Sequence, residues 1–225
     1  MSVLFHDRAE AGKKLAKRLT EYKQHADAIV LGLPRGGIIP ASEVAKSLNI
    51  PMDILLVRRL YVEEQNHLAI GAITSGGHKI LNQEVIQRYH ISSEQVDAAE
   101  QTSRALLQSR ERRYRGVVPE PTLAGHTVIL VDDGMKSGAT MQVAIASLRS
   151  QNPARIIVAV PLATQHSLDT LNHADEVICL QPMGMLASIA DGYKEFHRLD
   201  DDEVSDLLAE VKRFQYQDFD IPPFV

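Results

Sequence analysis

The chain carries five short runs of apolar residues, each long enough for one buried β-strand. The runs are continuously apolar and do not alternate with polar residues, a pattern typical of parallel strands that helices cover on both faces. β-Branched residues, which favour strands, are frequent in them. The five predicted strands cover residues 28–31, 53–57, 127–131, 155–160 and 176–180.

Amphipathic stretches separate these runs. Asp7 can cap a helix that extends to Leu19, with Ala11, Leu15 and Leu19 on its apolar face. Three further stretches with helical spacing of apolar residues cover residues 38–48, 139–148 and 164–172. Because strands and helices alternate, the sequence predicts an α/β fold with a doubly wound, mostly parallel sheet.

The segment between residues 61 and 121 breaks this alternation, because it is too long for one crossover between parallel strands. Residues 69–74 and 78–81 flank a Ser-Gly-Gly turn and predict a β-hairpin. A long helix is predicted from Ser92 to about Tyr114, and a last amphipathic helix over residues 201–214. We therefore expect a core of residues 1–60 and 120–185, and a smaller hood lobe of residues 61–119 and 186–225.

Charge and composition narrow the class of protein. The 24 Lys and Arg residues are outnumbered by 29 Asp and Glu residues, and a net charge of −5 gives no general attraction for nucleic acid. The single cysteine, Cys179, allows no internal disulfide, as is typical of a reducing compartment. No apolar run approaches the roughly 18 residues that cross a bilayer. We expect a cytoplasmic protein that binds neither a membrane nor nucleic acid.

The strand predicted over residues 127–131 leads directly into two carboxylates, Asp132 and Asp133. A loop of small residues follows, and a helix begins near Ala139. In open α/β sheets, ligands bind at this carboxyl edge of the strands. The loop can present backbone N–H groups and the hydroxyls of Ser137 and Thr140 to a phosphate at the positive end of the helix dipole. The paired acids suit ribose hydroxyls or a Mg²⁺ ion beside that phosphate.

This segment, VILVDDGMKSGATM, resembles the 5-phosphoribosyl 1-diphosphate (PRPP) binding motif of type I phosphoribosyltransferases. Three other segments fall in the order expected for that family: LPRGG at residues 33–37 resembles the diphosphate loop, VRR at residues 57–59 resembles a basic pair at the end of the next strand, and residues 61–79 occupy the place of a closing loop or hairpin. The LPRGG, LAIGA and VDDG segments together resemble a bacterial and archaeal group within the family. The resemblance implies an enzyme that transfers ribose 5-phosphate from PRPP to a small nitrogenous acceptor and releases diphosphate.

The resemblance also implies a role for each matching residue. Asp132 and Asp133 would hold the ribose hydroxyls and Mg²⁺, the implied cofactor. Arg35, Arg58 and Arg59 would neutralise the departing diphosphate as the catalytic cations. The remaining substrate-binding positions are backbone and side-chain donors of the two loops, namely Gly36, Gly37, Gly134, Met135, Lys136, Ser137, Gly138, Ala139 and Thr140.

Several of these positions leave alternatives open. Lys136 stands where 6-oxopurine transferases carry an aspartate, which disfavours hypoxanthine or guanine as the acceptor. Its side chain could meet an anionic acceptor, or point to solvent while only its N–H group binds phosphate. Side chains alternate along a strand, and only one of Arg58 and Arg59 can face the cleft. Tyr193 and Phe196 could stack on a planar base or pack under the last helix.

The arginines of the long predicted helix could contact an anionic acceptor or RNA, but we favour pairing with the acidic residues 200–203. Two rivals to the transferase remain. The first is a non-catalytic regulator that binds PRPP on the same fold. The second is a nucleotide-binding oxidoreductase, which the lack of a GxGxxG motif disfavours. Relatives in this family are commonly dimers, so the resemblance implies a homodimer. The sequence does not identify the acceptor.

Overall fold

The computed structural model describes residues 4–62, 68–116 and 120–218, and the side chains among them as far as residue 213. Five parallel strands form the central sheet in the order β2–β1–β6–β7–β8, which confirms the predicted fold class. These strands are β1 (Ala28–Gly32), β2 (Met52–Ile54), β6 (Thr127–Val131), β7 (Arg155–Ala163) and β8 (Glu176–Pro182).

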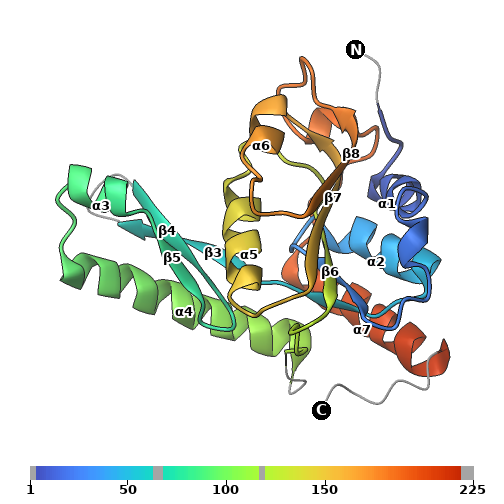
Figure 1. Ribbon diagram of the computed structural model, residues 1–225, viewed down its shortest axis with the longest axis horizontal. Helices are drawn as coiled ribbons and strands as arrows, with labels where there is room; N and C mark the ends of the chain where they lie inside the picture. The colour runs from blue at the N-terminus through green and yellow to red at the C-terminus, as the bar shows by residue number, and fades with distance from the viewer. Residues whose placement is uncertain (1–3, 63–67, 117–119, 219–225) are drawn as a thin grey trace.

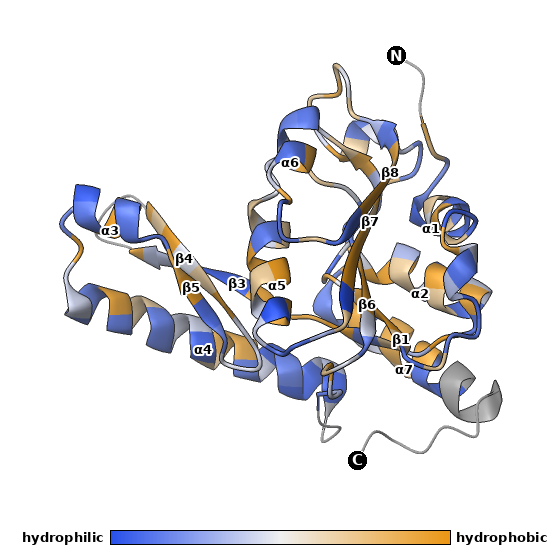
Figure 2. Ribbon diagram, in the orientation of Figure 1, coloured by the Kyte–Doolittle hydropathy of each residue, from blue (hydrophilic) through white to orange (hydrophobic). Residues whose placement is uncertain are grey.

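Helices cover both faces of this sheet, as the apolar runs predicted (Figure 1). Side chains alternate along each strand: Val30 and Ile129 enter the apolar cluster with α1 (Arg8–Ala16) and α2 (Ile38–Leu48). Leu31 and Leu130 point the other way, into the cluster with α5 (Ala139–Arg149). Every residue of β1 and β6 is buried, and Figure 2 shows the apolar character of the central strands. Short elements complete this domain: α6 (Gln165–Asp169) and the 3-10 turns η1 (Thr20–Tyr22) and η3 (Ala190–Gly192).

The predicted hairpin is present as two of the three strands of a second, antiparallel sheet, one central and one at the edge. The strands of this sheet are β3 (Val57–Val62), β4 (Leu68–Thr74) and β5 (Lys79–Leu81), in that order. The short helix α3 (Gln83–Arg88) and the long helix α4 (Ser93–Arg115) follow. Ser92 caps α4 in a capping box with Gln95, at the residue where the sequence predicted this helix to begin. Figure 1 shows that this sheet and most of α4 project to one side of the parallel sheet.

The strand predicted over residues 53–57 is wrong in its extent. The parallel strand β2 ends at Ile54, and a new strand begins at Val57. Leu55 and Leu56 connect the two strands and are buried in different apolar clusters, so the apolar run continues where the strand does not. Arg58 and Arg59 therefore begin β3 of the antiparallel sheet and do not end a parallel strand.

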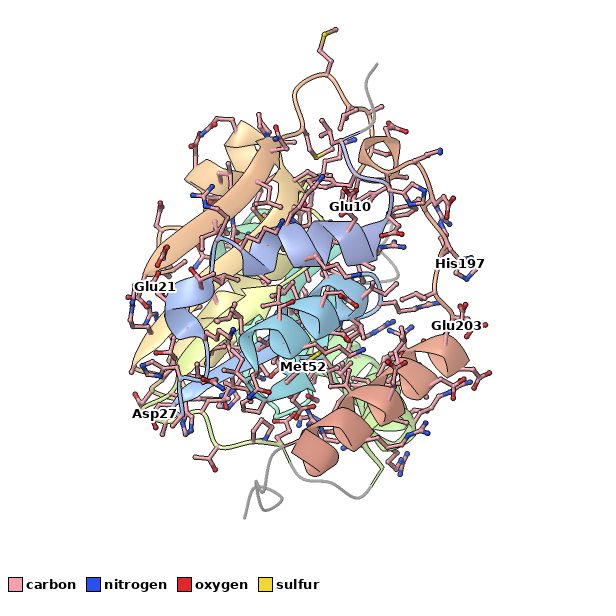
Figure 3. All side chains as sticks on the ribbon, turned by 90° about the vertical axis from the view of Figure 1, so that its right-hand side faces the viewer. Glu10, Glu21, Asp27, Met52, His197 and Glu203 are labelled. Carbon is pink, nitrogen blue, oxygen red and sulfur yellow. The ribbon has the colours of Figure 1, made fainter. Side chains whose placement is uncertain are left out.

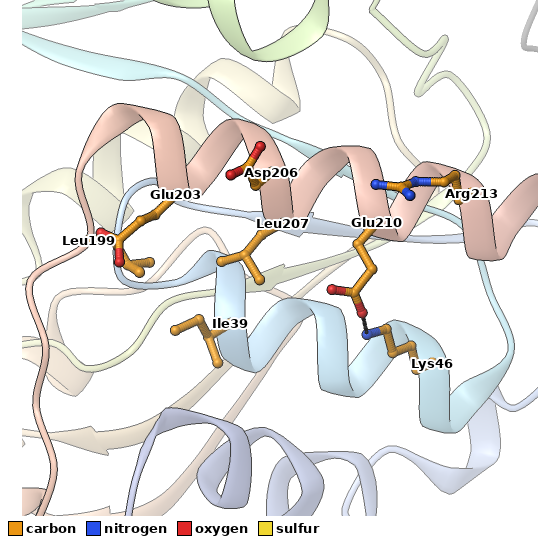
Figure 4. A pocket seen from close by; sticks show the side chains of 8 residues that line it. All are labelled: Ile39, Lys46, Leu199, Glu203, Asp206, Leu207, Glu210 and Arg213. Carbon is orange, nitrogen blue, oxygen red and sulfur yellow. Dashed lines mark hydrogen bonds and ion pairs between the residues drawn. The ribbon is translucent and has the colours of Figure 1, made fainter.

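The last helix, α7 (Asp201–Asp218), packs across α2 and α4. Between α2 and α7 lies an open groove of about 1000 Å³, with Lys46 of α2 and Glu210 of α7 paired at 2.8 Å across it (Figure 4). At its other end, α7 meets the arginines of α4: Arg113 pairs with Asp202 and Arg110 approaches Asp201 at 3.9 Å. The predicted pairing is confirmed for these two arginines.

The predicted pairing with the acidic residues 200–203 is wrong for Arg115. Only 2% of the Arg115 side chain is exposed. It pairs with Asp53, Glu111 and Glu120 at 3.0–3.1 Å. Among the described residues, no helix is both long and apolar enough to span a membrane.

Candidate active site

The two acids lie where β6 ends at the carboxyl edge of the sheet. The Asp133 side chain is buried, and Asp132 is partly buried beside it. Oδ1 of Asp132 accepts the backbone N–H of Asp133 at 2.8 Å. Burial and then the neighbouring Asp133 carboxylate raise the pKa of Asp132 well above its usual range. A cation or hydroxyl donors would relieve the repulsion between the two carboxylates, so the pair is chemically suited to such ligands.

The loop after the acids is anchored on one side and open on the other. The backbone N–H of Met135 donates a hydrogen bond to Leu162 O at 2.9 Å. The backbone carbonyl of Met135 accepts one from the Ser167 hydroxyl at 3.1 Å. Gly138 then adopts a left-handed conformation, φ 71°, at the start of α5. No described residue accepts a hydrogen bond from the five backbone N–H groups of residues 136–140. Free amides at a helix N-terminus provide an anion site.

The LPRGG loop lies directly against the acid pair. A Cβ added to Gly36 would stand 2.0 Å from Oδ2 of Asp133, and one added to Gly37 would stand 2.8 Å from Cα of Asp132. Only glycines allow this approach. The N–H of Gly37 donates to Leu33 O at 3.0 Å, so that amide is already engaged within the loop. The peptide bond between Pro34 and Arg35 is cis.

The Arg35 side chain reaches the segment before α7. Its guanidinium donates to Leu199 O at 3.1 Å and stands 3.4 Å from the carboxylate of Asp201, while 45% of the side chain is exposed. Tyr114 of α4 donates its hydroxyl to the same Asp201 carboxylate. Arg35 thus lies on the loop that adjoins the acids, and its head group is exposed and within reach of an anion.

Arg58 and Arg59 are adjacent in β3 and point to opposite faces of the antiparallel sheet. Arg59 lines a groove of about 720 Å³ between that sheet and α5, and this groove also touches Ala139 at the start of α5. Nε of Arg58 is buried and has no partner among the described residues. No hydrogen bond or ion pair in the described part of the chain joins either arginine to the acid pair.

The Lys136 side chain is exposed and also contacts a later segment of the chain. Its Nζ donates to the backbone carbonyl of Ala187 at 2.7 Å, which ties the loop to the segment before η3. In that segment Ile189 lies against Gly134, where an added Cβ would stand 2.8 Å from the isoleucine side chain. The segment after β8 therefore closes over the loop.

The sequence reasoning missed Arg8 at this site and considered only base stacking or packing for Tyr193. Arg8 of α1 pairs with Asp133, and Tyr193 donates its hydroxyl to Asp133 O at 2.6 Å. Tyr193 also stacks on Phe5 and Phe196, which favours packing over base stacking for its ring. The sequence held one signal for Arg8: its spacing from Ala11 and Leu15 places a charged side chain on the apolar face of a helix.

Comparison with known proteins identifies the family. The family model described as "Phosphoribosyl transferase domain" matches residues 5–185. The chain belongs to this family. Two Mycobacterium tuberculosis proteins, "Putative phosphoribosyl transferase Rv0571c" and its counterpart MT0597, are each 38% identical to it over 211 residues, which is 93% of this chain.

This phosphoribosyl transferase domain accounts for only part of those relatives, since the alignment covers 47% of their length. Among solved structures, the protein TT1426 from Thermus thermophilus is similar over almost its whole length. The similarity covers 92% of this chain and 98% of TT1426, with 33% identity and a TM-score of 0.79. The arrangement of both sheets is therefore shared with a solved protein.

Proposed function

We propose that this chain transfers the ribose 5-phosphate group of PRPP to a small nitrogenous acceptor. The observation that carries the proposal is the meeting of the acid pair, the free amides of residues 136–140 and the LPRGG loop at one edge of the sheet. PRPP carries a 5′-phosphate, a ribose with two hydroxyls and a diphosphate, and each of these groups has a chemically matched partner there.

In this proposal the acceptor nitrogen forms a bond to C1 of the ribose while the bond from C1 to the diphosphate oxygen breaks. The electron pair leaves with the diphosphate, and the acceptor loses its proton. Asp132 and Asp133 accept hydrogen bonds from the ribose hydroxyls, and the amides of residues 136–140 hold the 5′-phosphate. Arg35 and the Gly36 amide stabilise the negative charge that accumulates on the leaving group in the transition state. Arg59 lines the groove that touches Ala139 at the start of α5, and we assign it a secondary role in neutralising the diphosphate. We assign Arg58 no contact with the substrate.

The acid pair also suits Mg²⁺. No group of three or more His, Cys, Asp or Glu side chains in the described part of the chain could hold a metal by itself. Mg²⁺ is commonly bound by one or two carboxylates together with phosphate oxygens of a substrate and water. Asp132 and Asp133 would hold it, and when bound the ion would offset the negative charge of the diphosphate. We further propose a cytoplasmic location and a homodimer, both as expectations from the family.

Titration calorimetry with PRPP and MgCl₂ tests this function. We expect wild-type protein to bind with a dissociation constant in the micromolar range, about −8 kcal/mol, and Asp132→Asn/Asp133→Asn to lose that binding. The matched control, Asp97→Asn/Asp206→Asn, removes two exposed acids from α4 and α7 and should bind as wild type does. Equal binding by the acid-pair variant would refute the site, and no binding by wild type would refute the function.

A second assay addresses catalysis. Release of diphosphate from PRPP is measured with each of a series of nitrogenous bases as the acceptor. Turnover with one acceptor and not with the others identifies the substrate. Binding of PRPP without turnover for any acceptor would contradict the transferase and leave a PRPP-binding protein.

A further inference from the structure

The strongest unassigned feature of the site is the guanidinium of Arg8. It is 5% exposed and comes from the first turn of α1, 125 residues before the carboxylate that it contacts. Nε donates to Oδ2 of Asp133 at 2.7 Å, and another nitrogen donates to His197 O at 2.6 Å. Its plane lies 3.8 Å from the centre of the Phe196 ring. Two separate segments of the chain, the acid pair and residues 196–197, therefore meet on this one side chain.

The segment that follows η3 is held from both sides. Figure 3 shows His197 beside Glu203 of α7, near the end of α1 that carries Glu10, and the imidazole of His197 lies 2.8 Å from the Glu203 carboxylate. The backbone carbonyl of His197 accepts a hydrogen bond from Arg8. The carbonyl of Leu199, two residues later, accepts one from Arg35. The arginine at the acid pair and the arginine of the LPRGG loop are thus fixed by the same short stretch of backbone.

Burial makes the orientation of Asp133 costly to maintain without Arg8. Two adjacent carboxylates repel one another, and a buried carboxylate without a counter-charge either turns to solvent or loses its charge. Arg8 donates a hydrogen bond to Oδ2 of Asp133, and apart from the adjacent Asp132 carboxyl no described residue is a hydrogen-bond partner of Oδ1. Oδ1 is therefore the atom of Asp133 that can accept a ligand hydroxyl. Gly36 lies against the same carboxylate, so close that any side chain at this position would collide with Oδ2.

We propose that Arg8 is a positioning residue: it fixes the Asp133 carboxylate, together with the segment 196–199, in the orientation that recognises a ribose hydroxyl. This inference rests on the proposed function, because it assigns the source of ribose recognition within the same site. Arg8 does not itself contact the substrate. Its effect should therefore appear in discrimination between sugars with and without the hydroxyl, and should vanish when Asp133 is neutralised.

The test compares ribose 5-phosphate with 2-deoxyribose 5-phosphate in the presence of MgCl₂, by calorimetry. We expect wild type to prefer ribose 5-phosphate by roughly 10- to 100-fold, the range for a hydrogen bond to a charged group. Arg8→Met should reduce the preference to within about threefold of unity, and Arg8→Lys, which keeps the charge but not both donated bonds, should give an intermediate value. In the Asp133→Asn background, adding Arg8→Met should change the ratio no further.

Removing a guanidinium from a buried pair also destabilises the fold, so stability needs its own control. Leu15→Ala removes a fully buried side chain from the same helix without touching the acids, and it should lower the thermal midpoint while the sugar ratio stays at the wild-type value. If Arg8→Met does not fold, Arg8→Lys and the double variant Arg8→Met/Asp133→Asn carry the comparison.

Each result has a distinct meaning. Failure of wild type to bind PRPP refutes the proposed function, and this inference with it. PRPP binding without any preference between the two sugars leaves the function standing and overturns the role of Arg8. The same follows if Arg8→Met keeps the wild-type ratio, or if Leu15→Ala lowers the ratio as much as Arg8→Met does.

Discussion

Substitution of Gly36 by alanine is the sharpest test of how the LPRGG loop meets the acid pair. The added Cβ would lie 2.0 Å from Oδ2 and 2.5 Å from Cγ of Asp133, far inside van der Waals contact. Gly36 is not among the residues with positive φ, so the backbone itself tolerates alanine. Any cost therefore comes from the contact with the carboxylate and not from the φ angle.

The magnitude follows from the two ways in which the clash can be relieved. If Asp133 moves, the buried pair with Arg8 at 2.7 Å is broken, at a cost of about 3–5 kcal/mol. If the backbone of the loop shifts, the cost is that of overpacking, about 1–3 kcal/mol. The molecule takes the cheaper route, so we expect a loss of about 2 kcal/mol in the free energy of unfolding. For a chain of this size, that lowers the thermal midpoint by about 4–8 °C.

Urea unfolding of four proteins isolates the contact: wild type, Gly36→Ala, Asp133→Ala and the double variant. Asp133→Ala removes the atoms that the new methyl group would strike. In that background we expect Gly36→Ala to cost less than about 0.5 kcal/mol, so the two substitutions are strongly non-additive. An equal cost of Gly36→Ala in both backgrounds would refute the reasoning.

Two further predictions concern the charged clusters beside the site. The hydrogen bond from Tyr114, and then the nearby arginines, hold the pKa of Asp201 below its usual value, so its stabilising effect is present above pH 4 or so and is lost as the pH falls through the lowered pKa. The difference in unfolding free energy between wild type and Asp201→Asn should accordingly be constant from pH 5 to 8 and shrink towards pH 3; a constant difference throughout would contradict this. Arg115→Met should cost about 3 kcal/mol or more, because Asp53, Glu111 and Glu120 lose their buried partner. Burial raises the pKa of both Asp53 and Glu111, so this variant should lose stability as the pH rises from 5 to 8, and the opposite trend would refute the account.

The central sheet was predictable because burial on two faces leaves a continuous apolar run in each strand. The run of residues 127–131 coincides with β6, and that of residues 28–31 with all but the last residue of β1. The same signal misled at residues 53–57, where the connection between two sheets is as apolar as the strands that it joins. Apolar periodicity reports burial, and it marks a strand only where the buried segment is also paired.

From the residues themselves the site was predictable where they are neighbours in the sequence, and the LPRGG loop was predicted only through the family resemblance. The acids, the loop and the helix start follow one another along the chain, and the structure keeps them together at one edge of the sheet. Contacts between distant residues left almost no local trace. Tyr193 reaches Asp133 from 60 residues away, and nothing in its own segment indicates that partner. Lys136 is similar, because the acceptor of its hydrogen bond is a backbone carbonyl, which any residue at position 187 provides.

The contacts around Asp133 also bear on where specificity resides in this family member. The family model matches residues 5–185, whereas Tyr193, Phe196 and His197 lie beyond that match and all contact Asp133 or its partner Arg8. The Asp133 carboxylate is contacted by the LPRGG loop on one side and, directly or through Arg8, by this later segment on the other. If the shared loops bind the ribose 5-phosphate and diphosphate groups, changes after residue 185 can still alter the site through Arg8 without touching any residue of the PRPP motif.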